Sequence, residues 1–235
     1  MVPDLIQPWQ DLITAKLIRG DTEFASNELR FILDTTAPSK PTVLGAQSIS
    51  DGVMNSTDST GAFIRVTLPD DAKKGDIITL KVGSSVKDTS IIGVAQLADG
   101  YVEFLVTASD LGVDNDYYFT AFIVDVVGNA GEESEPFVLS VDTNILAPTI
   151  NAVAENDIIT SGEENSVISG TNELGASVVL SFGGVAKNAS VADTSWSYTL
   201  TDVDITAMGQ GSEIISVQQT DSAGNIKIDK SKSRE

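Results

Sequence analysis

The chain has 235 residues, a length that suits two domains of ordinary size and part of a third. Its 34 acidic residues against 14 basic ones give a formal net charge of −20, which argues against nucleic acid or an anionic membrane surface as a partner. The sequence contains neither cysteine nor histidine, so disulfides, thiol chemistry and the most frequent general base and zinc ligand are excluded.

The first 36 residues are predicted to be the last two strands of a preceding β-sandwich repeat, followed by a linker. Strand-like runs cover 12–18 and 26–33, with a turn between them. A lone hairpin is marginal in water, so we expect it to pack on a neighbour or on another copy of the chain, with Trp9 as a docking residue. No run approaches the ~18 apolar residues of a membrane span, and the N-terminus lacks a signal-peptide pattern. We therefore expect no membrane insertion in this segment, which we take for a piece of a longer exported protein.

Two acidic connectors divide the rest of the chain. Residues 33–38 spell Leu-Asp-Thr-Thr-Ala-Pro, and residues 141–148 spell Val-Asp-Thr-Asn-Ile-Leu-Ala-Pro. Proline has no amide donor and holds the preceding residue in an extended conformation. Each connector is therefore predicted to be a short, stiff linker that begins at Asp34 or Asp142.

Short runs rich in Val, Ile, Thr, Phe and Tyr fill the sequence around these linkers. They include 63–68, 77–82 and 117–124, and clusters of Gly, Asp, Asn and Ser bound them. Period-two patterning of this kind predicts an all-β protein built from tandem immunoglobulin-like β-sandwiches. We expect no helix longer than about two turns, with either a loop or a short helix at 109–112 and at 204–208.

An internal repeat supports this architecture. The loop sequence Asp-x-x-Gly-Asn occurs at 125–129 and again at 221–225, and the strand-like run at 75–80 matches the one at 175–180. The offset is about a hundred residues, the size of one immunoglobulin-like sandwich. We therefore predict one sandwich over 37–142 and a second over 143–235.

Four motifs resemble those of bacterial immunoglobulin-like repeats. They are the Asp-Thr-x-Ala-Pro type linker, Asp-x-x-Gly-Asn, Gly-Thr-x-Glu-x-Gly-Ala at 170–176 and Asp-x-Ser-Trp-Ser-Tyr-Thr at 193–199. Such repeats occur in giant RTX adhesins exported by type I secretion, including biofilm adhesins and the extender region of ice-binding adhesins. The resemblance implies sandwiches strung end to end on the bacterial cell surface, with Ca²⁺ at the junctions between them.

The resemblance also implies which acids bind that Ca²⁺: one from the linker, one from the Asp-x-x-Gly-Asn loop and one from the loop between the second and third strands. In an immunoglobulin-like sandwich the chain enters at the end that carries both loops, so the three acids are expected to converge. For any single Asp, a solvated turn remains the alternative. The candidate ligands are Asp34, Asp125 and either Asp70 or Asp71 in the first repeat, and Asp142, Asp221 and Glu173 in the second.

These features predict a structural extender of a large surface adhesin, with neighbouring repeats as its partners and any glycan or host-surface ligand elsewhere in the parent protein. The alternative is a module that itself binds a glycan or host protein, for which Tyr101 and Tyr117 are the few aromatic candidates besides Trp9. An enzyme with paired carboxylates is not expected. The close pairs Asp114/Asp116 and Asp70/Asp71 fit polar loops better.

Overall fold

A computed structural model describes residues 10–27, 29–49, 51–58, 60–155, 157–160, 163 and 165–230, so Trp9 lies outside the described residues. The chain divides into two compact units. The first comprises Met1–Leu44, Val66–Val102 and Phe119–Pro136, and the second Gly45–Arg65, Glu103–Tyr118 and Phe137–Glu235. The repeat boundaries expected near residues 36 and 142 stay predictions.

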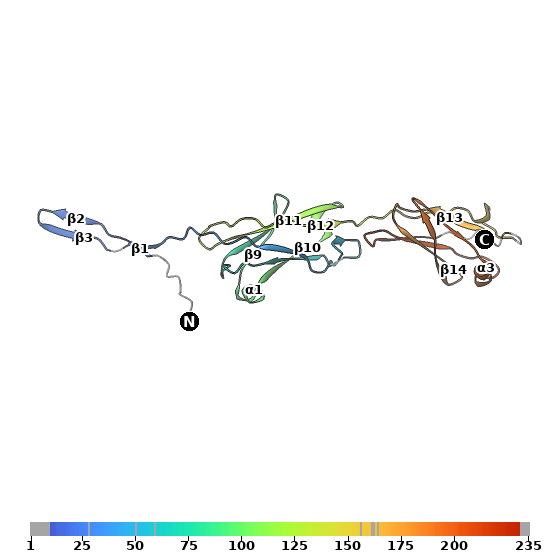
Figure 1. The fold of residues 1–235 in the computed structure, drawn as a ribbon, viewed down its shortest axis with the longest axis horizontal. Helices are drawn as coiled ribbons and strands as arrows, with labels where there is room; N and C mark the ends of the chain where they lie inside the picture. Colours follow the sequence, from blue (N-terminus) through green and yellow to red (C-terminus); the bar gives the residue numbers. More distant parts are fainter. Residues whose placement is uncertain are drawn as a thin grey trace. The chain divides into compact units, whose positions relative to one another are not determined.

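Strands form most of the regular structure (Figure 1), which confirms the all-β fold class. The strands are β1 (Gln10–Ile13), β2 (Lys16–Arg19), β3 (Thr22–Ala25), β4 (Leu29–Ile32), β5 (Thr42–Ala46), β6 (Val53–Met54), β7 (Ala62–Thr67), β8 (Ile77–Val82), β9 (Ser85–Ile91), β10 (Tyr101–Val106), β11 (Asn115–Val124), β12 (Phe137–Val141), β13 (Val167–Thr171), β14 (Ser177–Phe182), β15 (Val185–Asn188), β16 (Ser190–Ala192), β17 (Ser195–Thr199), β18 (Ser216–Thr220) and β19 (Ile226–Lys230).

The two largest sheets share one strand order. One runs β6-β12-β11-β8-β9 and the other β19-β18-β14-β15, so β12, β11, β8 and β9 correspond to β19, β18, β14 and β15. Among the described residues, two three-stranded sheets have the orders β10-β7-β5 and β13-β17-β16. The match predicted between 75–80 and 175–180 therefore falls on equivalent central strands, β8 and β14.

Burial alternates along β11, whereas β8 is buried at three successive residues, Ile78, Thr79 and Leu80. In the first unit, β8 and β11 pair antiparallel, with Leu80 opposite Ala121 and Ile78 opposite Ile123. All four side chains are fully buried. Apolar residues at every second position explain this, because successive side chains of a strand point to opposite faces.

In the second unit, the core forms around Trp196. Its ring packs with Ile168, Leu180, Phe182 and other apolar side chains, and only 1% of it is exposed. The indole N–H donates to the carbonyl oxygen of Thr149 at 3.1 Å, which satisfies the one polar atom of the ring. A Cβ at position 170 would lie 1.8 Å from that carbonyl oxygen, so glycine is required at the start of the Gly-Thr-x-Glu motif.

The N-terminal strands form a hairpin, β1 with β4 and β2 with β3 (Figure 1). Both β2 and β3 are exposed along their whole length. The prediction of one continuous strand over 12–18 is wrong, and β3 was not predicted. Between β1 and β2, the Ala15 amide donates to the Ser26 hydroxyl oxygen, while the Ala15 carbonyl oxygen accepts the Ser26 amide.

Short helical segments connect the strands in the described part of the chain: α1 (Val94–Asp99), α2 (Ala108–Leu111), α3 (Asp202–Met208) and the 3₁₀ turn η1 (Val153–Glu155). The sequence predicted a loop or a short helix near α2 and near α3. It did not predict α1, which ends at Gly100 in the left-handed conformation, with φ of 76°. Within the described residues, no helix is long and apolar enough to cross a membrane.

Helix α3 begins at a buried carboxylate. Oδ2 of Asp204 accepts the Thr201 amide at 3.0 Å and the Tyr198 hydroxyl at 2.9 Å, and Oδ1 lies 3.0 Å from Nζ of Lys187. Only 1% of Asp204 is exposed. Burial alone raises the pKa of this carboxyl, but the hydrogen bonds from Thr201, Lys187 and Tyr198 outweigh it and lower the pKa to about 2.

We expect Asp204→Asn to destabilise the protein by about 2–4 kcal/mol at pH 7, because it removes a helix cap and leaves the Lys187 ammonium without its partner. Since the folded pKa of Asp204 lies below its ordinary value, its contribution is present above that value and is lost as the pH falls towards about 2. Urea unfolding of both proteins between pH 7 and pH 2 measures this. Asp202→Asn, in the exposed first turn of α3, is the control; equal losses for both variants would contradict the prediction.

Candidate functional site

The first joint, formed by residues 34–39, Asp71 and the loop 125–129, lies within the first unit. Oδ2 of Asp71 accepts hydrogen bonds from the Ser39 amide at 3.0 Å and its hydroxyl at 2.9 Å. Nδ2 of Asn129 donates to the carbonyl oxygen of Asp34 at 3.1 Å. Of the two acids that the sequence left open, Asp71 therefore lies at the linker, whereas Asp70 is exposed and has no such bond within the described residues.

Asp125 organises the loop of this joint. Its Oδ1 accepts the amides of Val127, Gly128 and Asn129 at 2.8–2.9 Å, and its Oδ2 accepts the Asn129 side chain at 2.8 Å. Burial raises the pKa of Asp125, but these hydrogen bonds, led by that of the Asn129 side chain, lower it below its usual value. The Asp125 side chain thus holds the loop through these four hydrogen bonds.

The second joint, formed by residues 142–146, Glu173 and the loop 221–225, repeats this pattern within the second unit. Asp221 accepts the amide and the side chain of Asn225 at 2.8 and 3.0 Å. Nδ2 of Asn225 donates to the carbonyl oxygen of Asp142 at 2.9 Å. Oε2 of Glu173 accepts the amide of Leu146 at 2.7 Å, the counterpart of the bond that Asp71 makes to the first linker.

The structure adds Asp114, which sequence reasoning did not assign to the joint. Its carboxylate accepts the Thr143 amide at 3.0 Å, the Thr143 hydroxyl at 2.9 Å and the Asn144 side chain at 2.5 Å. One feature of the sequence could have indicated this role of Asp114. It lies just before β11, and that end of the expected sandwich is also the end from which the linker leaves. Asp116, its neighbour in the sequence, accepts the Ser140 hydroxyl at 2.5 Å.

Negative charge at the second joint is incompletely compensated. The pKa of Asp142 is raised, chiefly by burial, and further by the charges of Asp221, Asp114 and Glu173. Yet among the described residues no three metal-ligating side chains lie close enough together to hold an ion. The acids are therefore near enough to repel one another without forming a coordination sphere.

The donor chemistry at the second joint fits a hard cation. Its charged groups are all carboxylates, and Ca²⁺ prefers six to eight oxygen ligands over nitrogen or sulfur. Asn172, which precedes Glu173, adds a buried Oδ1 that has no hydrogen-bond donor within the described part of the chain. Asp142, Asp221 and Glu173, together with Asp114, are the residues that would hold such an ion.

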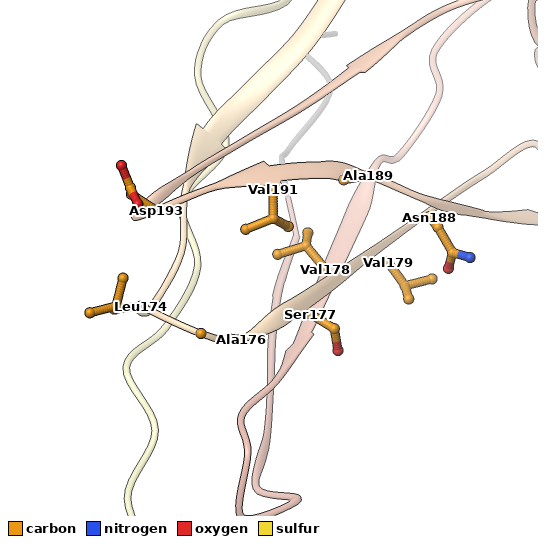
Figure 2. A pocket seen from close by; sticks show the side chains of 10 residues that line it. Leu174, Ala176, Ser177, Val178, Val179, Asn188, Ala189, Val191 and Asp193 are labelled. Atoms are coloured by element: carbon orange, nitrogen blue, oxygen red, sulfur yellow. The ribbon is translucent and has the colours of Figure 1, made fainter.

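A shallow hollow of about 680 Å³ lies where the chain passes from β15 to β16. Figure 2 shows Val178 of β14 and Val191 of β16 pointing toward one another, with Leu174 and Asp193 at one end. Asp193 is its one ionisable lining residue. The hollow thus offers apolar surface and no pair of catalytic groups.

No family model and no curated protein matches the chain. Among solved structures, it is similar to a Ca²⁺-stabilised adhesin that helps an Antarctic bacterium reach out and bind ice, at 23% identity and a TM-score of 0.50, over 95% of this chain and 55% of that one. This likeness establishes the fold. A second similar structure is that of a 1.5-MDa bacterial ice-binding adhesin, at 21% identity and a TM-score of 0.46, over 94% of this chain and 72% of that one. A third is a tetra-tandem repeat from the extending region of a large adhesion protein, at 21% identity and a TM-score of 0.34, over 94% of this chain and 55% of that one.

We expect Asp142→Asn to raise the melting temperature by a few degrees at pH 7 in chelator. Because the folded pKa of Asp142 is raised, stability falls as the pH rises from the ordinary Asp value through the folded one, and the variant lacks this penalty. The difference should disappear in acid, below the ordinary pKa. Thermal melts of wild type, Asp142→Asn and the matched linker variant Asp34→Asn from pH 3 to 7 test this. A lower melting temperature for Asp142→Asn throughout that range would contradict it.

Proposed function

We propose that this chain is a structural extender of a large bacterial cell-surface adhesin. The observation that carries the proposal is the repeated joint: in both, the loop asparagine donates to the carbonyl oxygen of the linker aspartate, from Asn129 to Asp34 and from Asn225 to Asp142. Because the same contact occurs at both joints, each linker is held to the loop beside it in the same way, as expected of a chain that sets the spacing between repeats. The similar fold of the Antarctic adhesin is consistent with that role.

Ca²⁺ bound at the junctions completes the proposal. At the second joint, an ion held by Asp142, Asp221 and Glu173 would offset the repulsion that raises the pKa of Asp142. Asp34, Asp71 and Asp125 would form the corresponding set at the first joint. Without the ion, the linkers would loosen and the repeats would move more independently.

The hydrogen bonds that Asp114, Asp116 and Tyr117 make within the protein favour the extender role over catalysis or glycan binding. Asp114 and Asp116 are engaged in hydrogen bonds to the second linker and to β12. The Tyr117 hydroxyl donates to the carbonyl oxygens of Leu111 and Val113. We therefore propose neighbouring repeats as the partners of this segment, with any external ligand bound elsewhere in the parent protein.

We expect Ca²⁺ to narrow the distribution of interdomain distances in small-angle scattering and to raise the melting temperature. At a hundredfold excess over Kd, one bound ion stabilises the folded state by about 2.7 kcal/mol. The measurement compares the full chain in Ca²⁺ with the same chain in EDTA. Identical scattering and melting curves under the two conditions would contradict the Ca²⁺ proposal.

The double variant Glu173→Gln/Asp221→Asn should show a smaller Ca²⁺-dependent rise in melting temperature, because it removes two carboxylates from the second joint while keeping side-chain size. Asp88→Asn with Asp229→Asn, at exposed or partly exposed positions on β9 and β19, removes the same charge elsewhere. If both double variants lose the Ca²⁺-dependent rise in melting temperature equally, the net charge of the chain controls this rise, and the carboxylates of the second joint do not. Calcium titrations followed by calorimetry distinguish the two cases.

A further inference from the structure

Within the second unit, the turn at 55–58 meets the loop at 221–225. Nδ2 of Asn55 donates to the carbonyl oxygen of Ala223 at 2.7 Å. In return, the amide of Ser56 donates to Oδ1 of Asn225 at 2.8 Å. Asn225 is fully buried. The two segments are 168 residues apart in the chain, and the sequence assigns them to different repeats.

Each asparagine uses one end of its amide within its own turn and the other end across the contact. Oδ1 of Asn55 accepts the amide and hydroxyl of Thr57 at 2.8 and 2.7 Å, which leaves its Nδ2 to reach Ala223. Nδ2 of Asn225 is occupied by Asp142 and Asp221, which leaves its Oδ1 for Ser56. These local bonds fix the orientation of both amides, so the contact forms with little loss of side-chain freedom.

The equivalent loop at 125–129 provides an internal comparison. Asn129 makes the same bonds to its Asp and to its linker, but no donor among the described residues reaches its Oδ1. A Cβ at Gly224 would lie 3.1 Å from Nδ2 of Asn55, whereas a Cβ at Gly128 would meet nothing within 4 Å. The two loops therefore share their internal structure and differ in this contact.

We propose that Asn55 and Asn225 form a reciprocal amide latch, in which the loop 221–225 receives the turn 55–58 of the preceding repeat. The latch joins consecutive repeats through direct hydrogen bonds, so its contribution to the second joint does not require a metal ion. It goes beyond the extender role because it gives the Asp-x-x-Gly-Asn loop a partner of defined chemistry. Asn55 and Asn225 are positioning residues in this arrangement.

Hydrogen exchange of the full chain in EDTA tests the latch. Asn55→Asp keeps the oxygen that accepts from Thr57 but places a carboxylate oxygen against the Ala223 carbonyl in place of the donor. We expect the Ser56 amide to exchange about 5- to 30-fold faster in this variant, as for the loss of one or two kcal/mol, while the Thr57 amide keeps its protection. A Ser56 amide that is unprotected in the wild type, or unaffected by Asn55→Asp, would overturn the proposal.

A matched pair of glycine variants separates the latch from loop strain. Gly224→Ala and Gly128→Ala both place a side chain at positive φ, 89° and 102°, but only the first crowds Asn55. Gly224→Ala should accelerate Ser56 exchange and Gly128→Ala should not; equal effects would argue against the latch. Because these measurements are made without Ca²⁺, a protected Ser56 amide supports the latch even if Ca²⁺ proves not to bind.

Discussion

The hydrogen bond from a loop asparagine to a linker carbonyl is the contact on which both joints depend. The linker leaves its strand at Asp34 or Asp142 and enters an extended segment. Within the described residues, no backbone donor reaches the carbonyl oxygen of either aspartate. Asn129 and Asn225 supply the missing donors. Each asparagine is in turn held by the aspartate four residues before it, so one carboxylate orders both the loop and the start of the linker.

Two opposing forces act where these contacts gather. Hydrogen bonds draw Asp71 and Glu173 onto the linkers and Asp114 onto Thr143 and Asn144. The same approach concentrates negative charge, and Asp142 experiences it through burial and three neighbouring acids. The hydrogen-bonded geometry thus brings carboxylates closer than their charges favour. A bound cation is one way to resolve this conflict. The hydrogen bonds from Asn55 to Ala223 and from Ser56 to Asn225 join neutral groups, so they add cohesion without offsetting the charge.

Period-two alternation was sufficient to predict the all-β class, because the alternation of side chains along a strand is a local property. The equivalence of β8 with β14 was predicted from the internal sequence repeat. The missed features are short or depend on distant partners. Helix α1 has six residues, too few for a helical period to stand out. Asp114 acts on Thr143, 29 residues away, and Asn55 acts on Ala223, 168 residues away, so only the assembled sheets reveal them. The choice of Asp71 over Asp70 likewise required the position of Ser39.

The lack of histidine has a consequence for how these joints respond to their surroundings. Aspartate and glutamate ordinarily titrate near pH 4 and lysine above pH 10, so side chains with ordinary pKa values contribute almost no buffering between pH 6 and 8. Moderate acidification or alkalinisation in that interval would leave the net charge of the chain nearly constant. Ionic strength is then an external variable that alters the electrostatic balance of the chain in that interval.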